Sequence, residues 1–296
     1  MNIASDKLEN SQWQTSRYLL ELSEPKVMGI VNITPDSFSD GGKYVDSKNA
    51  ISRCEALIAQ GVDILDIGAE STRPGAVPLC VEDELERLFP VVREAVKLGI
   101  PISIDTYKPE VMQAMLDIGV DIINDVYALR IPGTVDVVAK HPTCGICLMH
   151  MHRNPLDMQN FPVDSNIVSV VEAFMKDRMH VLYENGIQTN RLILDAGIGF
   201  GKKLEQNFEL MAFQSYLSQK FQRPWLAGWS RKSSLGIVTG QKSPELRVTA
   251  SVAAALLSVD RGARLVRVHD VRETVEALSV WLAEQRAKRC YSMGNV

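Results

Sequence analysis

Short apolar runs of strand length alternate with segments of helical spacing eight times along this chain. The runs lie at 26–31, 63–67, 101–104, 120–123, 145–149, 191–194, 224–228 and 264–268. Continuous apolar runs are typical of parallel strands that helices cover on both faces. Eight such strand–helix units predict an α/β fold, a single (β/α)8 TIM barrel. A doubly wound open sheet is the alternative, but no Gly-x-Gly-x-x-Gly follows the first run, which weakens a dinucleotide-binding version of it.

The segments between the runs carry helix signals of their own. Residues 85–96 have apolar side chains at helical spacing, but Pro90 lies among them, so we expect a kink or a break there. The segment over 243–262 begins with Ser-Pro, an N-cap followed by proline at the first helical position. These signals support helices between the strands.

The chain is long enough for one large core, with 296 residues and 46% hydrophobic content. Because we see no linker or low-complexity segment, we expect one barrel domain over 25–287. Residues 1–24 form an N-terminal extension of that domain, within which 8–24 are predicted to form a strand or hairpin closing the bottom of the barrel. The tail over 288–296 is expected to be solvated.

Charge and composition argue against several classes of partner. A net charge of −4 gives no field for binding nucleic acid or an anionic membrane surface. No apolar run approaches the roughly 18 residues of a membrane-spanning helix, and the first residues show no signal-peptide pattern. Five scattered cysteines favour a reducing compartment. We therefore expect a cytoplasmic protein.

Polar or ionisable residues end every one of the eight runs. They are Asn32, Asp66, Asp105, Asn124 with Asp125, His150, Asp195, Arg231 with Lys232, and Arg267 with His269. In a barrel these ends share one rim, where the chemistry of the fold is found. A single Asp or Asn is often only a turn residue, but eight such ends together indicate a ligand site. Carboxylates embedded in apolar runs need donors, and a ligand rich in N–H groups would supply them.

Three further features invite a functional interpretation. Phe38 stands in a polar loop with nothing apolar beside it, although an ordinary turn is an equal alternative. The Gly-x-Gly-x-Gly-Lys sequence at 197–202 lacks the spacing of a phosphate loop and is interpreted as a flexible turn. Cys144 and Cys147 would face opposite sides of a strand, and His150 is interpreted as a hydrogen-bonded barrel residue.

Motifs on all eight strands resemble, in order, those of the dihydropteroate synthase family. They are NITPDSFSDGG from Asn32, IGAESTRPG from Ile67, IDT from Ile104, INDV from Ile123, LMHM from Leu148, LDAGIGFGK from Leu194, SRKS from Ser230 and RVHD from Arg267. The resemblance covers about residues 25–285. It implies a TIM barrel, a cytoplasmic homodimer and a transferase of folate biosynthesis. The family joins 6-hydroxymethyl-7,8-dihydropterin diphosphate to p-aminobenzoate, releases diphosphate with Mg2+, and is inhibited by sulfonamides.

The resemblance also implies where a pterin would bind. A pterin presents a 2-amino group and a ring N–H side by side, which suits a bidentate carboxylate. The family pattern places Asp195 at that edge, Asn124 and Asp105 at the other ring heteroatoms, Lys232 over the ring, and Met149 and Phe200 on its faces.

Diphosphate departure leaves a carbocation in the family's dissociative mechanism, so cations and a metal matter more than a nucleophile. Asn32 matches the Mg2+ position, while Arg267 and His269 match the diphosphate cradle. Lys232, Arg267, Asp105 and Arg73 are the predicted catalytic residues. The arylamine is already unprotonated at pH 7, so no strong general base is needed.

Loops 33–43 and 69–78 would close over the diphosphate and build the aminobenzoate pocket. The resemblance implies that Phe38, Thr72, Arg73 and Pro74 form its walls, that Asp40 lies near the amine, and that Ser233 receives the carboxylate at a helix start. Loop closure would keep water from capturing the cation.

Two departures and two alternatives accompany the resemblance. Ala196 stands where the family usually has proline, and 152–153 read His-Arg where it has Gln-Gly, which puts the backbone shape of that loop in doubt. A barrel that transfers a methyl group from a folate to a corrinoid has no use for the Ser-Arg-Lys loop. A non-catalytic paralogue is expected to lose Asn32, Arg73, Lys232 or Arg267, and all four are present.

Overall fold

The computed structural model describes residues 11–33, 43–71, 75–154, 158, 160 and 162–294. Eight parallel strands close into a barrel in the order β10-β3-β4-β5-β6-β7-β8-β9. They are β3 (Lys26–Asn32), β4 (Ile64–Gly68), β5 (Ile102–Asp105), β6 (Ile122–Asp125), β7 (Gly145–Met149), β8 (Leu192–Asp195), β9 (Trp225–Ala227) and β10 (Leu265–Val268). The last strand pairs with the first, Val266 opposite Val27, so the barrel is confirmed and the open sheet is excluded.

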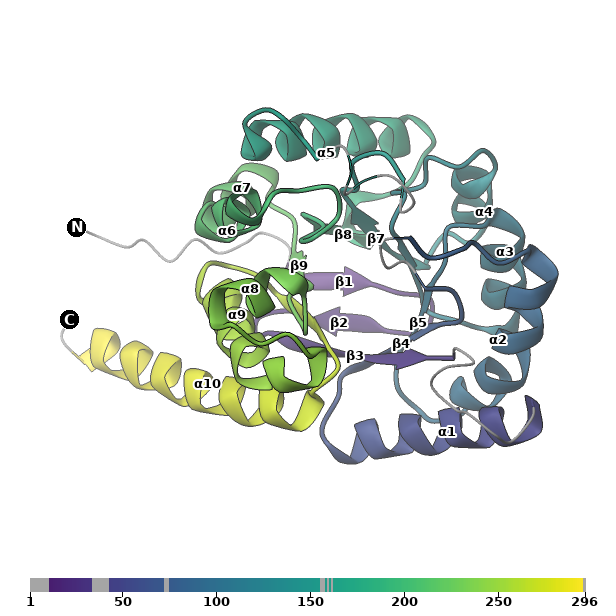
Figure 1. Cartoon of the computed structure of the whole chain (residues 1–296), viewed down its shortest axis with the longest axis horizontal. Coiled ribbons are helices and arrows are strands. Elements are labelled where there is room, and N and C mark those ends of the chain that lie inside the picture. Colours follow the sequence, from purple (N-terminus) through teal and green to yellow (C-terminus); the bar gives the residue numbers. More distant parts are fainter. Residues whose placement is uncertain are drawn as a thin grey trace.

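Helices surround the strands, as Figure 1 shows. They are α1 (Lys43–Ala59), α2 (Val81–Ala95), α3 (Pro109–Ile118), α4 (Thr134–Lys140), α5 (Ile167–Glu184), α6 (Leu204–Ala212), α7 (Gln214–Phe221), α8 (Ser233–Thr239), α9 (Val248–Asp260) and α10 (Val271–Gly294). Two short 3-10 helices, Thr189–Arg191 and Pro244–Arg247, precede β8 and α9. None of the helices in the described part of the chain is both long and apolar enough to cross a membrane.

An antiparallel hairpin precedes the barrel and closes its amino-terminal end, as expected. It consists of β1 (Gln12–Gln14) and β2 (Leu19–Glu21). Trp13 is fully buried against the residues inside the barrel, and its indole N–H donates to the carbonyl of Arg191 over 2.8 Å. Arg17 donates to the buried carboxylate of Asp121 over 2.6 Å. These contacts fix the hairpin to the lower end of the barrel.

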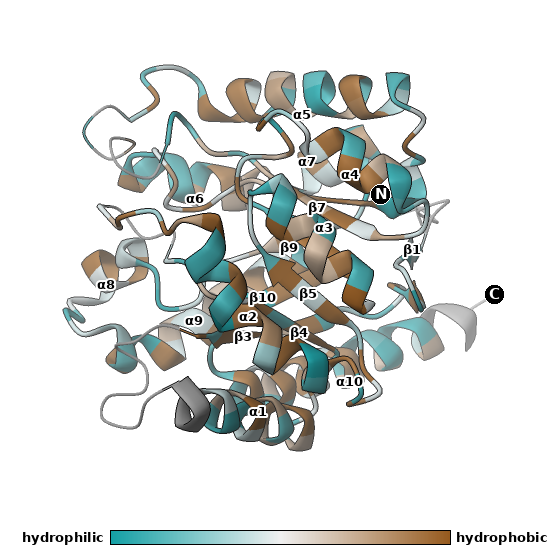
Figure 2. Ribbon diagram, turned by 90° about the vertical axis from the view of Figure 1, so that its right-hand side faces the viewer, coloured by the Kyte–Doolittle hydropathy of each residue, from teal (hydrophilic) through white to brown (hydrophobic). Residues whose placement is uncertain are grey.

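The two largest of the three apolar clusters follow from the alternation of side chains along each strand. One face of every strand packs against the helices, and Figure 2 shows the strands as the most hydrophobic elements at the centre. The other face fills the lower barrel with Met28, Ile64, Ile122, Cys147, Ile193, Leu226 and Leu265. The next inward position of a strand lies two residues further on, so the upper barrel receives Asp66, Asn124, Met149, Asp195 and Arg267. The interior of the barrel is therefore hydrophobic at the amino-terminal ends of the strands and polar at their carboxyl ends.

Of the kink or break expected at Pro90, the break is wrong, because α2 continues from Val81 to Ala95 without interruption. Pro90 lies on the exposed side of the helix, while Leu88, Val91 and Val92 are fully buried on the other. Burial of the apolar face outweighs the lost hydrogen bond.

Candidate active site

The predicted site residues of the described chain lie at the carboxyl ends of the strands or in the loops directly after them. Asn32, Asp105, Asn124, Met149, Asp195 and Arg267 belong to strands; Phe200, Lys232, Ser233 and His269 follow strands. Phe38, Asp40, Thr72, Arg73 and Pro74 lie outside the described residues. The barrel thus brings ten of the predicted residues to one rim.

Arg267 holds two carboxylates inside the barrel. Its Nε donates to Asp66 Oδ2 over 2.6 Å, and its Nη2 donates to Asp105 Oδ2 over 2.7 Å. Asn124 Nδ2 also donates to Asp66 Oδ2, over 3.2 Å. Burial raises the pKa of Asp105 to about 7 although Arg267 opposes the shift. Burial disfavours the charge of Arg267, but Asp66 and Asp105 outweigh it and raise its pKa.

Asp66 is the residue whose importance the sequence prediction missed. Its side chain is wholly buried, and it connects two predicted substrate residues, Arg267 and Asn124. The signal was present: a lone Asp within Ile64-Leu65-Asp66-Ile67 cannot stay buried without a cation or several donors. The donor is Arg267, so these carboxylates do not depend on a ligand alone. The Oδ1 atoms of Asp66 and Asp105 have no hydrogen-bond partner among the described residues, which leaves acceptors for an N–H group or water.

A flat apolar wall stands beside Asp195. Phe200 and Met149 are buried in one cluster with Val126, Met151 and Met158. Lys232 Nζ lies 4.3 Å from the ring centroid of Phe200. Burial raises the pKa of Asp195, while the Gly197 N–H, which donates to its Oδ1 over 2.8 Å, opposes the shift. A carboxylate, a cation and an aromatic face therefore meet where an aromatic ring with N–H groups fits.

The glycine-rich turn after β8 is tightly packed, so its glycines have a structural reason beyond the flexible turn that the sequence predicts. Gly197, Gly199 and Gly201 all have positive φ, between 67° and 81°. A Cβ at Gly197 would lie 1.9 Å from the carbonyl oxygen of His150. The glycines are needed because the turn lies directly against the end of β7.

His150 differs in part from its prediction. It is buried directly after β7, but its Nδ1 has no hydrogen-bond partner among the residues that the structure describes, and its ring packs edge-on against that of Phe174, with 4.9 Å between the ring centroids. Burial lowers its pKa to about 2.

In the following loop Arg153 has a φ of 61°, so the backbone keeps the left-handed conformation that suits the family's glycine. Cys144 and Cys147 are free and lie in different cores, as the strand alternation predicts.

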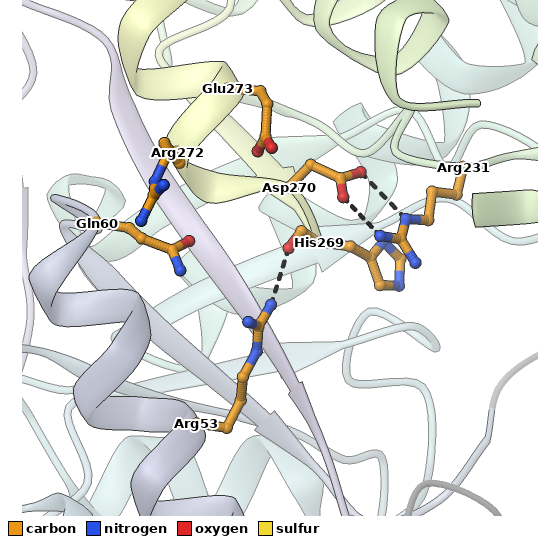
Figure 3. A pocket seen from close by; sticks show the side chains of 7 residues that line it. All are labelled: Arg53, Gln60, Arg231, His269, Asp270, Arg272 and Glu273. Carbon is orange, nitrogen blue, oxygen red and sulfur yellow. Dashed lines mark hydrogen bonds and ion pairs between the residues drawn. The ribbon is translucent and has the colours of Figure 1, made fainter. Parts of the chain in front are cut away.

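A cavity of about 370 Å³ lies on the outer side of His269 (Figure 3). It is lined by Arg53, Gln60, Arg231, His269, Asp270, Arg272 and Glu273. Arg53 donates to the carbonyl of His269 over 3.1 Å, and Arg231 pairs with Asp270 at 2.5 Å. The His269 backbone N–H donates to Ser230 Oγ over 3.1 Å, and that oxygen also lies within hydrogen-bond distance of the ring Nδ1, at 3.0 Å. Burial lowers the pKa of His269 to about 3, so the ring is neutral at pH 7.

A second buried charge network lies under the loop after β4. Lys108 pairs with both Glu70 and Glu84. Glu70 also accepts from the hydroxyl of Tyr107 over 2.7 Å and from the backbone N–H of Leu79 over 3.0 Å. Glu70 therefore ties the two ends of 70–79 to the loop after β5. No local sequence pattern predicts these contacts of Glu70.

We expect Lys108→Met to destabilise the protein by about 3–5 kcal/mol, because it leaves two buried carboxylates without their cation. Urea unfolding at pH 7 measures the effect. Lys97→Met is the matched control, since Lys97 pairs with Glu94 on the surface and should cost less than about 1 kcal/mol. Equal costs for the two variants would contradict this account of the network.

The chain matches the family model described as "Pterin binding enzyme" over residues 28–269. Its fold and rim define a barrel enzyme of that class. A dihydropteroate synthase of Neisseria meningitidis serogroup B is 47% identical over 92% of this chain and 96% of its own length. The chain therefore belongs to the dihydropteroate synthase family.

Solved structures of the same family superpose over nearly the whole chain. The Xanthomonas albilineans enzyme with 4-aminobenzoic acid has a TM-score of 0.87 and 45% identity, over 93% of this chain and 98% of that one. The Burkholderia cenocepacia enzyme complexed with 7,8-dihydropteroate has a TM-score of 0.85 and 43% identity, over 95% and 98%. The Yersinia pestis enzyme with a sulfonamide drug complex has a TM-score of 0.87 and 39% identity, over 93% and 99%.

Proposed function

We propose that this transferase condenses 6-hydroxymethyl-7,8-dihydropterin diphosphate with p-aminobenzoate, giving 7,8-dihydropteroate and diphosphate. The observation that carries the proposal is the meeting of Asp195, the Phe200 wall and the Lys232 cation at the rim of the barrel. The relatives bound to 4-aminobenzoic acid and to 7,8-dihydropteroate support both substrates.

The pterin ring is proposed to lie between the apolar wall and the buried polar groups. Asp195 would accept from the 2-amino group and the neighbouring ring N–H. Asn124 and the Oδ1 of Asp105 would meet the remaining heteroatoms, since that Oδ1 has no partner within the described chain. Met149 and Phe200 would cover the faces of the ring.

The carbon–oxygen bond to diphosphate would break before the amine attacks, in a dissociative substitution. Charge then develops on the leaving group, so preorganised donors at that end lower the barrier. Arg267, Lys232 and the neutral ring of His269 lie at the described rim and would supply such donors, and Arg73 would join them. The amine of p-aminobenzoate attacks the methylene cation and afterwards releases its proton.

A magnesium ion bound with the diphosphate fits the residues present. No group of three or more His, Cys, Asp or Glu in the described part of the chain is arranged to hold a metal. Mg2+ usually binds through one or two protein oxygens together with substrate phosphates, so the exposed amide of Asn32 is a sufficient protein ligand. The ion would neutralise charge on the departing diphosphate.

The p-aminobenzoate pocket is proposed to use Phe38, Thr72, Arg73, Pro74 and Asp40, with Ser233 receiving the carboxylate. Ser233 is exposed as the first residue of α8, directly after Lys232. We propose that sulfonamides compete for this pocket, as the Yersinia pestis complex suggests.

The test is diphosphate release from the pterin diphosphate, with and without p-aminobenzoate. We expect release and dihydropteroate formation with both substrates and Mg2+, a large loss after chelation with EDTA, and competition by a sulfonamide. No product under any of these conditions would refute the synthase function.

We also propose a homodimer whose interface includes α8, the 3-10 helix Pro244–Arg247 and α9. These elements contact one another and expose Ile237 (63%), Val238 (56%), Leu246 (66%) and Leu257 (45%). Apolar side chains gathered in this way on a surface are typical of protein interfaces.

Ile237→Glu is expected to convert the dimer to monomer, because it places a charge within an apolar interface. Light scattering after size-exclusion chromatography gives the mass. Tyr183→Glu, which changes an equally exposed residue of α5, serves as the control and should leave the mass unchanged. A monomeric wild-type protein at micromolar concentration would disprove the dimer.

A cytoplasmic location remains part of the proposal. The five cysteines are all free, two of them exposed, which agrees with a reducing compartment.

A further inference from the structure

Lys202 ends the glycine-rich turn and points its ammonium group into the protein. The residue is only 4% exposed. Its Nζ donates to three carbonyl oxygens, those of Gly197 over 2.7 Å, Phe200 over 3.0 Å and His150 over 3.2 Å. An ammonium group has three N–H donors, and all three are used.

The glycines allow the backbone to wrap around this ammonium. The positive φ angles of Gly197 and Gly199 are rarely adopted by other residues, and a Cβ at Gly201 would lie 2.7 Å from that of His152. Two of the three carbonyls belong to the turn itself, and the third belongs to the end of β7. The ammonium thus joins the turn to the neighbouring strand.

The same turn places two groups of the proposed pterin pocket. Its Gly197 N–H donates to Asp195 Oδ1 over 2.8 Å, and Phe200 lies within it. Its Gly199 N–H donates to Asn207 Oδ1 over 2.7 Å. Asn207 in turn donates to Ser234 Oγ in α8 over 3.1 Å, next to the loop that carries Lys232.

The surroundings of Lys202 act on its charge in opposite directions. Burial lowers its pKa to about 7 and Lys232 lowers it as well, while the carboxylate of Asp195 raises it. The three carbonyl acceptors hold Nζ in place by hydrogen bonds. A second buried lysine therefore lies close to Asp195, with its Nζ turned toward backbone carbonyls.

We propose that Lys202 is a positioning residue for the pterin pocket: its Nζ is a fixed internal hydrogen-bond donor around which the turn folds, so that Asp195 and Phe200 hold their orientation. The inference rests on the proposed function, since it concerns the affinity of the same site. It assigns Lys202 no contact with either substrate. A group that acts only through Asp195 and Phe200 affects the pterin more than p-aminobenzoate.

The test is Lys202→Met, which keeps the length of the side chain and removes the charge and the donors. We expect the dissociation constant for 6-hydroxymethylpterin, measured by calorimetry, to rise by about 10- to 100-fold, as for other residues that orient ligand-binding groups. The KM for p-aminobenzoate should change by less than threefold. Lys203→Met is the matched control, because Lys203 is the next residue and pairs with Asp164 on the surface; its pterin affinity should equal that of the wild type.

A second variant covers the case in which Lys202→Met does not fold. Asn207→Ala removes the side-chain oxygen that accepts from the Gly199 N–H, which is the second contact that holds the turn. It should weaken pterin binding by a smaller factor than Lys202→Met and leave the KM for p-aminobenzoate nearly unchanged. Unchanged pterin affinity in either folded variant, or equal losses for both substrates, would overturn the inference. If the wild-type protein binds no pterin at all, the proposed function itself fails, which is a separate and recognisable outcome.

Discussion

Replacing Arg267 with methionine is expected to reduce kcat/KM by about 10²–10³-fold, because it removes a donor that we propose stabilises the departing diphosphate. It should also destabilise the fold by about 3–5 kcal/mol, since Asp66 and Asp105 lose their shared cation inside the barrel.

The loss of stability should depend on pH in a defined direction. Without Arg267, the pKa of Asp105 rises further above its value in the unfolded chain, beyond the value of about 7 that it already has. Folding then favours its protonated form, a contribution that is present at low pH and is lost as the pH rises through the folded pKa. The stability difference between wild type and variant is therefore larger at pH 8 than at pH 5.

Urea unfolding at these two pH values checks the prediction. Arg286→Met is the control, because Arg286 forms a surface pair with Glu24 at 3.0 Å and should contribute less than about 1 kcal/mol. Adding Asp66→Asn to Arg267→Met should restore part of the stability, because it removes one of the buried charges. A variant whose stability deficit is the same at both pH values would contradict the assigned pairing.

Lys232→Ala is expected to reduce kcat/KM by about 10²–10³-fold while leaving the fold intact. Lys232 is the N-cap residue of α8, but its side chain makes no capping hydrogen bond, and its Nζ lies over the ring of Phe200. The loss should appear mainly as weaker pterin binding and slower diphosphate release.

Steady-state kinetics and a thermal unfolding curve separate the two effects. Lys242→Ala, a nearby exposed lysine, should retain full activity. An unchanged rate for Lys232→Ala would refute its catalytic role, and a large drop in the unfolding midpoint would show that the side chain supports the fold instead.

Much of this architecture was predictable because it depends on periodicity. Eight apolar runs define the barrel, and their polar ends define the rim that contains Asp105, Asn124, Asp195 and Arg267. Once it is known which strand residues point into the barrel, the pairing of Asp66 with Arg267 also follows, since both side chains lie in the upper barrel.

Other features depend on contacts that no local pattern specifies. The ion pairs of Lys108 join side chains 38 and 24 residues away, and they exist only after α2 and the loop after β5 are in place. The role of Lys202 was missed because its partners are backbone carbonyls, which every residue carries. Pro90 was misjudged because its effect depends on which face of α2 meets solvent.

The hairpin at the amino-terminal end gives the barrel a single opening. Trp13 and Leu22 close the floor together with the apolar layer above them, so nothing can pass through the barrel from below. A ligand that reaches Asp105 and Asp195 therefore has to enter and leave at the carboxyl ends of the strands, on the side opposite the hairpin.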